Sequence, residues 1–207
     1  MIYRDKSELI WKLVRKTDVV LDVGFSGQGV RAGNQNWPHA ILKNAAKEVY
    51  GVDIDLAPEF ASDSHYQKAS AESFEFPLKF DVIFAGDIIE HLSNPGLFLA
   101  ACKRHLKDGG RLIITTPNAF NLFNLSEKLT KREPTVNHDH TCYFNSKTLA
   151  VLLGKNGFVA ESVDYLYTLG IAYEESFKKQ VLNALYWLFA RFTDKFVETL
   201  VVVAIAR

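Results

Sequence analysis

Residues 19–29 constrain the fold of this chain more than any other stretch. They begin with an apolar run, reach an acid at Asp22 and continue into a loop with glycines at positions 24, 27 and 29. Such a run predicts a buried parallel strand, and glycines after it let a ligand approach the backbone. A second strand-like segment, residues 48–53, also ends in an acid, Asp53. Because ligands bind at the carboxyl ends of strands in open α/β sheets, the two segments together predict a pocket for a nucleoside.

Segments of strand type alternate with segments of helix type along the chain, which predicts an α/β sheet with helices on both faces. We expect seven strands, at residues 18–23, 48–53, 66–69, 80–85, 111–116, 158–165 and 198–206. We expect helices at residues 7–15 (within an N-terminal segment 1–17), 38–47, 94–106, 146–155 and 174–192, with one more near 120–131. The turn residues Asp108-Gly109-Gly110 are expected to end the helix at 94–106.

The composition predicts one soluble domain spanning residues 1–207, with no sign of a nucleic-acid partner. Lys+Arg and Asp+Glu both number 24, and the basic residues are scattered. The longest apolar run, residues 200–206, is too short for a transmembrane segment, and the charged N-terminus is unlike a signal peptide. The two cysteines, Cys102 and Cys142, have no metal-ligand spacing. We therefore expect a cytoplasmic protein without structural disulfides.

Four motifs along the chain together resemble one known family. They are residues 21–24 (Leu-Asp-Val-Gly), 51–53 (Gly-Val-Asp), 80–92 (Phe-Asp-Val-Ile-Phe-Ala-Gly-Asp-Ile-Ile-Glu-His-Leu) and 110–118 (Gly-Arg-Leu-Ile-Ile-Thr-Thr-Pro-Asn). Their order and spacing are similar to those of the class I methyltransferases that use S-adenosylmethionine, over about residues 15–168. Glu-His-Leu after the fourth strand is typical of the family's small-molecule branch. The resemblance implies a single doubly wound, mostly parallel seven-stranded sheet whose last strand is antiparallel.

The resemblance also implies an activity. S-adenosyl-L-methionine would be the cofactor, and its methyl group would pass by direct displacement to an oxygen or nitrogen of a small molecule, or of a glycan or lipid precursor. Two other functions stay open: a non-catalytic S-adenosylmethionine-binding or regulatory module, and an NAD(P)-dependent oxidoreductase. The oxidoreductase fits least, because glycines at 24, 27 and 29 do not match the Gly-x-Gly-x-x-Gly fingerprint.

The resemblance places cofactor contacts after each of the first four strands. The residues implied are Asp22, Gly24, Phe25, Ser26, Gly27, Asp53, Ile54, Ser70, Ala71, Glu72, Gly86, Asp87 and Ile88. Asp53 would accept hydrogen bonds from the ribose hydroxyls, and Ser70 or Glu72 would meet the adenine amino group. For Asp22 the alternative is a cap of the loop backbone. For Asp53 it is a surface turn, with Asp55 taking over its role.

The glycine loop departs from the family's pattern. The family's glycines lie two, four and six residues after the acid, whereas here they lie two, five and seven residues after it, with Phe25 and Ser26 in between. The loop is also long and runs to residue 36. A looser resemblance, to a subgroup that shares the long loop, includes an aromatic residue and a histidine at the start of the next helix, as Trp37 and His39 stand here.

Three histidines are candidate catalytic residues. His138 and His140 lie where the resemblance places a segment over the substrate, and His91 follows the fourth strand. A histidine titrates near neutral pH and can remove the proton from a hydroxyl or amine nucleophile. The alternatives are imidazoles that only hydrogen-bond to carbonyls, and a metal site at His138, Asp139 and His140. We expect no metal, because no further cluster of His, Cys or acidic residues accompanies them.

Two segments, residues 118–144 and 170–194, are expected to cover the substrate cleft. Connections as long as the first often serve as lids or binding loops. The second contains the aromatic-rich helix expected at 174–192. Packing of this helix on the sheet is the first interpretation. A homodimer interface and contact with a membrane surface are the alternatives.

Overall fold

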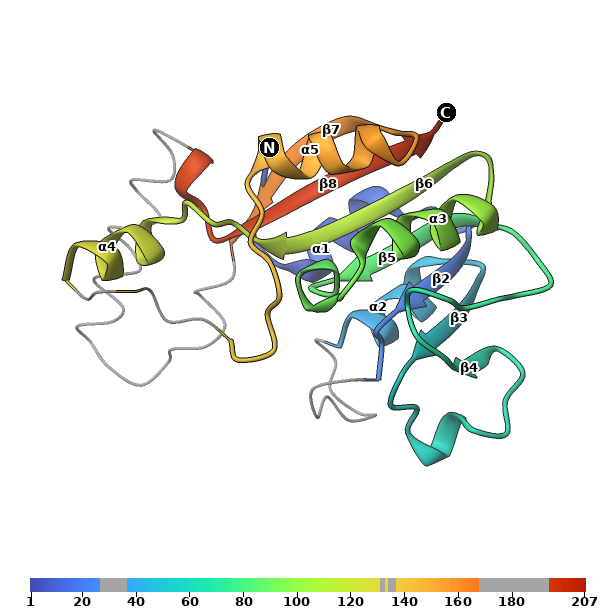
Figure 1. Ribbon diagram of the computed structural model, residues 1–207. Helices are drawn as coiled ribbons and strands as arrows, with labels where there is room; N and C mark the ends of the chain where they lie inside the picture. The colour runs from blue at the N-terminus through green and yellow to red at the C-terminus, as the bar shows by residue number, and fades with distance from the viewer. Residues whose placement is uncertain (27–36, 131–132, 134–136, 168–193) are drawn as a thin grey trace.

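The computed structural model describes residues 1–26, 37–130, 133, 137–167 and 194–207 (Figure 1). Its centre is a single eight-stranded sheet in the order β1-β7-β8-β6-β5-β2-β3-β4. The strands are β1 (Ile2–Tyr3), β2 (Val19–Val23), β3 (Glu48–Asp53), β4 (Tyr66–Lys68), β5 (Phe80–Gly86), β6 (Leu106–Pro117), β7 (Phe158–Leu166) and β8 (Thr199–Ala206). β8 is antiparallel to its neighbours β6 and β7, and the other neighbouring pairs are parallel. The expected mostly parallel sheet with an antiparallel last strand is confirmed.

The eighth strand, β1, corrects the expected count of seven. It pairs in parallel with β7, Ile2 opposite Tyr165 and Tyr3 opposite Leu166. Two residues carry too little apolar alternation for a strand to be predicted. The first helix follows at once, because the Asp5 side chain accepts a hydrogen bond from the backbone N–H of Glu8 and caps it.

Helices cover both faces of the sheet (Figure 1). They are α1 (Lys6–Leu13), α2 (Pro38–Ala45), α3 (Pro95–His105), α4 (Leu122–Thr130) and α5 (Ser146–Lys155), with 3₁₀ helices η1 (Pro58–Phe60), η2 (Ile89–His91) and η3 (Asp194–Phe196). Val82 and Phe84 of β5 belong to the apolar core shared with α1 and α2. Ile83 and Ala85 belong to the opposite core, shared with α3 and α5. A strand buried on both faces reads as a continuous apolar run, as β5 does.

The helix α3 ends earlier than its glycine signal predicts. It ends at His105, and β6 begins at the next residue, so Asp108-Gly109-Gly110 lies inside the strand. Gly109 has a φ of +73°, and a Cβ on Gly110 would lie 2.9 Å from the carbonyl oxygen of Lys107. The register between β5 and β6 shifts at the same end of the pair. The glycines therefore allow an irregular start of β6 and do not end the helix.

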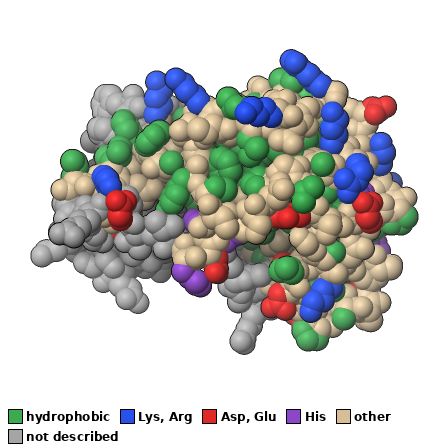
Figure 2. Space-filling model, in the orientation of Figure 1, with side chains coloured by type: hydrophobic (Ala, Val, Ile, Leu, Met, Phe, Trp, Pro, Cys, Tyr) green, Lys and Arg blue, Asp and Glu red, His purple; other side chains and the backbone are tan. Residues whose placement is uncertain are grey.

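The two expected cover segments differ in how much of them the structure describes. In the first, residues 118–144, α4 lies beyond the end of β6 and outside the layers of the sheet (Figure 1). The helix expected at 174–192 lies outside the described residues, as do the homodimer and membrane contacts expected of it. Among the helices that are described, none is long and apolar enough to cross a membrane. On the face drawn in Figure 2, lysine and arginine side chains are spread among other kinds.

Candidate functional site

The carboxyl ends of β2, β3 and β5 meet at one edge of the sheet and form a pocket of about 310 Å³. The strands are adjacent and parallel, so the side chains that follow them lie close together. The predicted site residues that line this pocket are Asp22, Gly24, Phe25, Asp53, Ile54, Gly86, Asp87, Ile88 and His91. Lys6, Trp37, His39 and Asp139 line it as well.

Asp53 is a buried carboxylate at the end of β3, only 6% exposed. Its Oδ2 accepts a hydrogen bond from the backbone N–H of Ser26 at 2.8 Å, and its Oδ1 accepts one from the backbone N–H of Asp55 at 2.9 Å. A carboxylate has about four acceptor positions, and the described residues fill two of those of Asp53. The next residue, Ile54, is 73% exposed at the rim of the pocket. The Asp53 carboxylate could accept hydrogen bonds from the hydroxyls of a ribose, and the apolar side chain of Ile54 could lie against the base that the ribose carries.

Gly24 brings the loop after β2 against the residues that follow β5. It has a φ of +78°, which L side chains rarely adopt, and its N–H donates to the carbonyl of Val52 at 2.8 Å. A Cβ at this position would lie 2.1 Å from Cδ1 of Ile88. A larger residue here would be strained by this φ and would also require the Ile88 side chain to move.

Phe25 packs inward and fills one wall of the pocket. Its ring centroid lies 4.6 Å from that of His39, 5.0 Å from Tyr66, 5.1 Å from Phe60 and 6.3 Å from Trp37. We call these five residues the aromatic cluster. Its loop is held in place because the indole N–H of Trp37 donates to the carbonyl of Phe25 at 2.8 Å. The unusual glycine spacing thus makes room for an aromatic anchor.

Asp22 lies between the pocket and the aromatic cluster. It is 3% exposed, and its Oδ2 lies 3.0 Å from Nδ1 of His39, whose Nε2 lies 3.0 Å from the hydroxyl of Tyr66. Burial raises the pKa of Asp22, and the hydrogen bond from His39 opposes that rise. The predicted acid is therefore held by a histidine from α2, a contact that a motif around residue 22 does not reveal.

Asp87 and Lys6 form an ion pair in the pocket. The Nζ of Lys6, from the first turn of α1, donates to Oδ2 of Asp87 at 2.6 Å, and the hydroxyl of Thr115 donates to Oδ1 at 3.0 Å. Asp87 itself has a φ of +55°, a rare conformation for a residue other than glycine. Lys6 is a site residue that sequence reasoning missed, since nothing near position 6 marks it.

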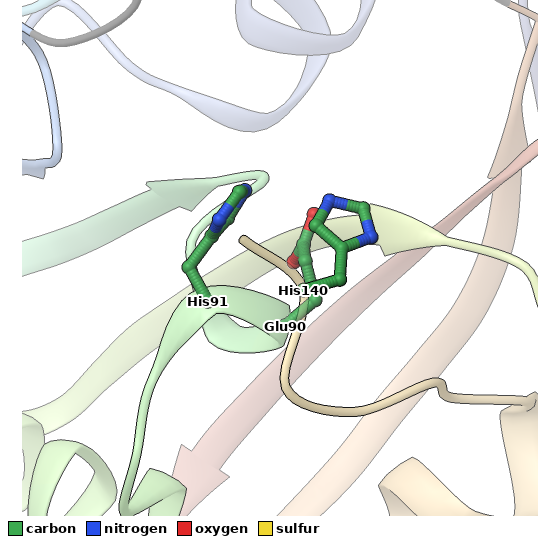
Figure 3. A group of neighbouring side chains, drawn as sticks. All are labelled: Glu90, His91 and His140. Carbon is green, nitrogen blue, oxygen red and sulfur yellow. The ribbon is translucent and has the colours of Figure 1, made fainter. Parts of the chain in front are cut away.

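Beside this pocket, Glu90 and His91 of η2 meet His140 from the segment after α4 (Figure 3). The two histidine ring centroids lie 4.6 Å apart, and the ring planes are nearly perpendicular at 88°. One carboxylate oxygen and one nitrogen of each ring lie within 4.8 Å of one another, so the group has the composition of a divalent-cation site. Of the predicted catalytic residues, the structure thus brings together His91 and His140.

Glu90 and His140 carry shifted pKa values. Glu90 is 1% exposed, and burial, with the nearby charge of Asp87, raises its pKa to about 7. Its Oε2 accepts a hydrogen bond from the hydroxyl of Thr116 at 2.8 Å. Burial, with the charge of His91, lowers the pKa of His140, which is therefore neutral at physiological pH.

Other predicted residues lie elsewhere. The His138 side chain is 90% exposed and is not itself part of the pocket lining, although its Nε2 lies 3.2 Å from Oδ1 of the lining residue Asp139. Ser70, Ala71 and Glu72 are not part of that lining: Ser70 Oγ accepts a hydrogen bond from the N–H of Glu72, whose carboxylate accepts one from the N–H of Asn94. Ser26 contributes its N–H to Asp53, and Gly27 lies outside the described residues. The adenine contact expected at 70–72 stays a prediction.

The family model described as "Methyltransferase domain" matches residues 3–163. Among curated proteins, the chain is similar to a ubiquinone biosynthesis O-methyltransferase of Pseudomonas entomophila, 31% identical over 136 residues that cover 58% of this chain and 55% of that one. A protein of the same name from Colwellia psychrerythraea is 29% identical over 146 residues, covering 63% and 56%. The chain thus spans little more than half the length of these two relatives.

Solved structures share the fold. A 1,6-didemethyltoxoflavin-N1-methyltransferase of Burkholderia thailandensis, crystallised with 1,6-didemethyltoxoflavin and S-adenosylhomocysteine, superposes with a TM-score of 0.61 at 17% identity, covering 97% of this chain and 76% of that one. An S-adenosylmethionine-dependent methyltransferase of Archaeoglobus fulgidus gives 0.59 at 18% identity, covering 96% and 93%. At these identities the similarity concerns the fold alone.

Proposed function

Because this chain belongs to the class I S-adenosylmethionine-dependent methyltransferases, we propose that it transfers the methyl group of S-adenosylmethionine to an oxygen or nitrogen of a small molecule. The observation that carries the proposal is the pocket where the buried carboxylate of Asp53, the backbone of Gly24 and the ion pair of Lys6 with Asp87 meet. Its volume of about 310 Å³ is at the small end of the range for small-molecule sites.

The residues present fit the cofactor's parts. The carboxylate of Asp53 suits the ribose hydroxyls, and the exposed side chain of Ile54 suits the face of the adenine. Lys6 is the cation that would hold the carboxylate of the amino-acid end, beside the glycine backbone at 24. When bound, the cofactor supplies a methyl group on a positively charged sulfur, which opens that methyl to attack by an electron pair.

The chain's own part on the acceptor side is to align the nucleophile and take its proton. His140 is the residue we assign to proton removal, because it is neutral at physiological pH and its ring stands against that of the pocket residue His91. His138 is 90% exposed and takes no part in this proposal. The relatives named for O-methylation in ubiquinone biosynthesis support an oxygen as the acceptor atom.

Calorimetric titration with S-adenosylmethionine, S-adenosylhomocysteine and NAD tests the cofactor assignment. We expect the first two to bind and NAD not to bind. The variant Asp53→Asn should bind S-adenosylmethionine roughly 10- to 100-fold more weakly, because a hydrogen bond to a charged acceptor contributes about 1.5–3 kcal/mol. The exposed neighbour offers the matched control, Asp55→Asn, which should leave affinity unchanged.

Two outcomes would contradict this proposal. A protein that binds neither S-adenosylmethionine nor its product has no methyl-donor site. A protein that binds both, but transfers no labelled methyl group to any member of a panel of phenols, amines and carboxylic acids, would be a binding or regulatory module.

A further inference from the structure

Two buried polar atoms belong to neighbouring side chains beside the pocket. One is Oε1 of Glu90 and the other is Nδ1 of His140, and within the part of the chain that the structure describes neither has a hydrogen-bond partner. Buried polar atoms in native proteins are nearly always paired, so an unpaired one needs an explanation. Here two such atoms come from neighbouring side chains (Figure 3). One carboxylate oxygen of Glu90 and one ring nitrogen of His140 lie within 4.8 Å of each other, and no hydrogen bond joins the two unpaired atoms in the structure, so a rotation of either side chain is needed to bring them together.

The backbone holds the two side chains together. The carbonyl of Glu90 accepts hydrogen bonds from the N–H of Thr141 at 2.8 Å, from the N–H of Cys142 at 3.3 Å and from the hydroxyl of Thr141 at 3.0 Å. His140 precedes these two residues, so its position over η2 is fixed by Glu90's own peptide group. On the other side, Thr116 of β6 occupies Oε2 of the Glu90 carboxylate and leaves Oε1 for a second donor.

We propose that Glu90 is a positioning residue for His140, whose Nδ1–H it receives on Oε1. That hydrogen bond selects the imidazole tautomer with an unprotonated Nε2, which is the atom that then takes the acceptor's proton. The inference rests on the proposed function, in which the acceptor loses a proton as the methyl group arrives. A ring nitrogen that is held by a carboxylate is the general way in which a catalytic histidine is oriented.

The charges around the pair set the pH at which it works. The charged or titratable groups that face it are Asp87, Asp139, Lys6 and the thiol of Cys142, with His91 beside the His140 ring. Burial and Asp87 raise the pKa of Glu90 to about 7, while burial and His91 lower that of His140. The working state, a carboxylate beside a neutral imidazole, is therefore populated above about pH 7.

A divalent cation is the competing occupant of this cluster, because Glu90, His91 and His140 could supply three ligands. The hydrogen bond is the simpler arrangement: it needs one pair of atoms to close, whereas an ion needs three atoms at about 2.0–2.2 Å from one point. The experiment below separates the two.

Long-range ¹H–¹⁵N correlation spectra of protein labelled at histidine report which ring nitrogen carries the proton. The chain has six histidines, so the variant His140→Asn assigns the His140 signals by difference. Between about pH 5 and pH 9, wild-type His140 should reach the Nδ1–H tautomer as Glu90 ionises. In Glu90→Leu, His140 should revert to the Nε2–H tautomer that free imidazole favours. In Glu90→Gln, the change of the His140 signals near pH 7 that follows ionisation of Glu90 should disappear.

Thr116→Val is the matched control, because it removes the donor to the other carboxylate oxygen and leaves Oε1 in place. It should keep the Nδ1–H tautomer. A His140 spectrum that is the same in wild type, Glu90→Leu and Glu90→Gln overturns the proposal. Equimolar binding of Zn²⁺ by chelator-treated protein also overturns the proposal. Such binding would shift the His91 and His140 signals in wild type and would be abolished in Glu90→Leu. The spectra need neither methyl donor nor acceptor, so this result is independent of whether the proposed function holds.

Discussion

Replacing Glu90 with glutamine is expected to stabilise the protein at alkaline pH and to leave its stability almost unchanged in acid. Glutamine has nearly the same shape and can still accept the hydrogen bond from Thr116, but it cannot ionise. The wild-type carboxyl must release a proton inside the protein as the pH rises, where burial and the charge of Asp87 oppose the negative form.

The magnitude follows from the pKa of Glu90, which rises from an ordinary 4.5 to about 7 in the folded protein. Between these values the folded state holds a proton that the unfolded state has already lost, so stability falls as the pH rises through that window. At about 1.4 kcal/mol per pH unit, the loss reaches about 3 kcal/mol above pH 7. For a chain of this size, Glu90→Gln should then melt roughly 6–12 °C higher than wild type.

Urea unfolding followed by circular dichroism measures the difference at about pH 4.5 and about pH 8. The gain of Glu90→Gln over wild type should be close to zero at the lower pH and about 3 kcal/mol at the higher. Glu161→Gln, at an exposed position on β7, is the control and should show no gain at either pH. A gain for Glu90→Gln that does not change with pH would refute the reasoning, because it would show that Glu90 ionises as freely as an exposed carboxyl.

Three further predictions concern the pocket. Lys6→Met should weaken the binding of S-adenosylmethionine about tenfold or more. It should hardly affect the binding of methylthioadenosine, which lacks the carboxylate. Equal losses of affinity for the two ligands in calorimetry would show that Lys6 does not bind the carboxylate. Gly24→Ala should abolish cofactor binding, because the new Cβ would lie 2.1 Å from Cδ1 of Ile88 at a φ of +78°, and a titration like that of wild type would contradict the geometry. His140→Ala should lower turnover by roughly 10²- to 10⁴-fold without changing the dissociation constant of S-adenosylmethionine, whereas parallel losses in rate and affinity would argue against a base.

Elements whose signals are local could be predicted from the sequence. The helix expected at 146–155 has these same bounds in the structure, because Asn145 and Thr148 form a capping box at its start. The strand expected at 48–53 is likewise found at Glu48–Asp53, since an apolar run ending in an acid is also a local pattern. β1 could not be predicted, because its two residues are a strand only through their pairing with β7.

The same distinction explains the candidate site. The acids Asp22 and Asp53 lie in the last residues of β2 and β3, so their place at the sheet edge follows from the fold. Lys6 meets Asp87 from 81 positions away, and no pattern around either residue announces the pair. Glu90, His91 and His140 likewise come together only in three dimensions, so the sequence alone does not show that His140 has these neighbours.

The aromatic cluster also limits how this chain can change over time. A Cβ on Gly51 would lie 2.6 Å from the ring of Phe25 and 2.8 Å from that of Tyr66, so a larger residue at 51 requires both rings to move or to be replaced by smaller side chains. In the same cluster, Nδ1 of His39 lies beside Asp22, and Nε2 of His39 lies beside the hydroxyl of Tyr66. Substitutions at these positions are therefore epistatic: each is tolerated only after another has occurred. Homologues should keep or exchange the set as one unit, and the altered glycine spacing should be inherited with it.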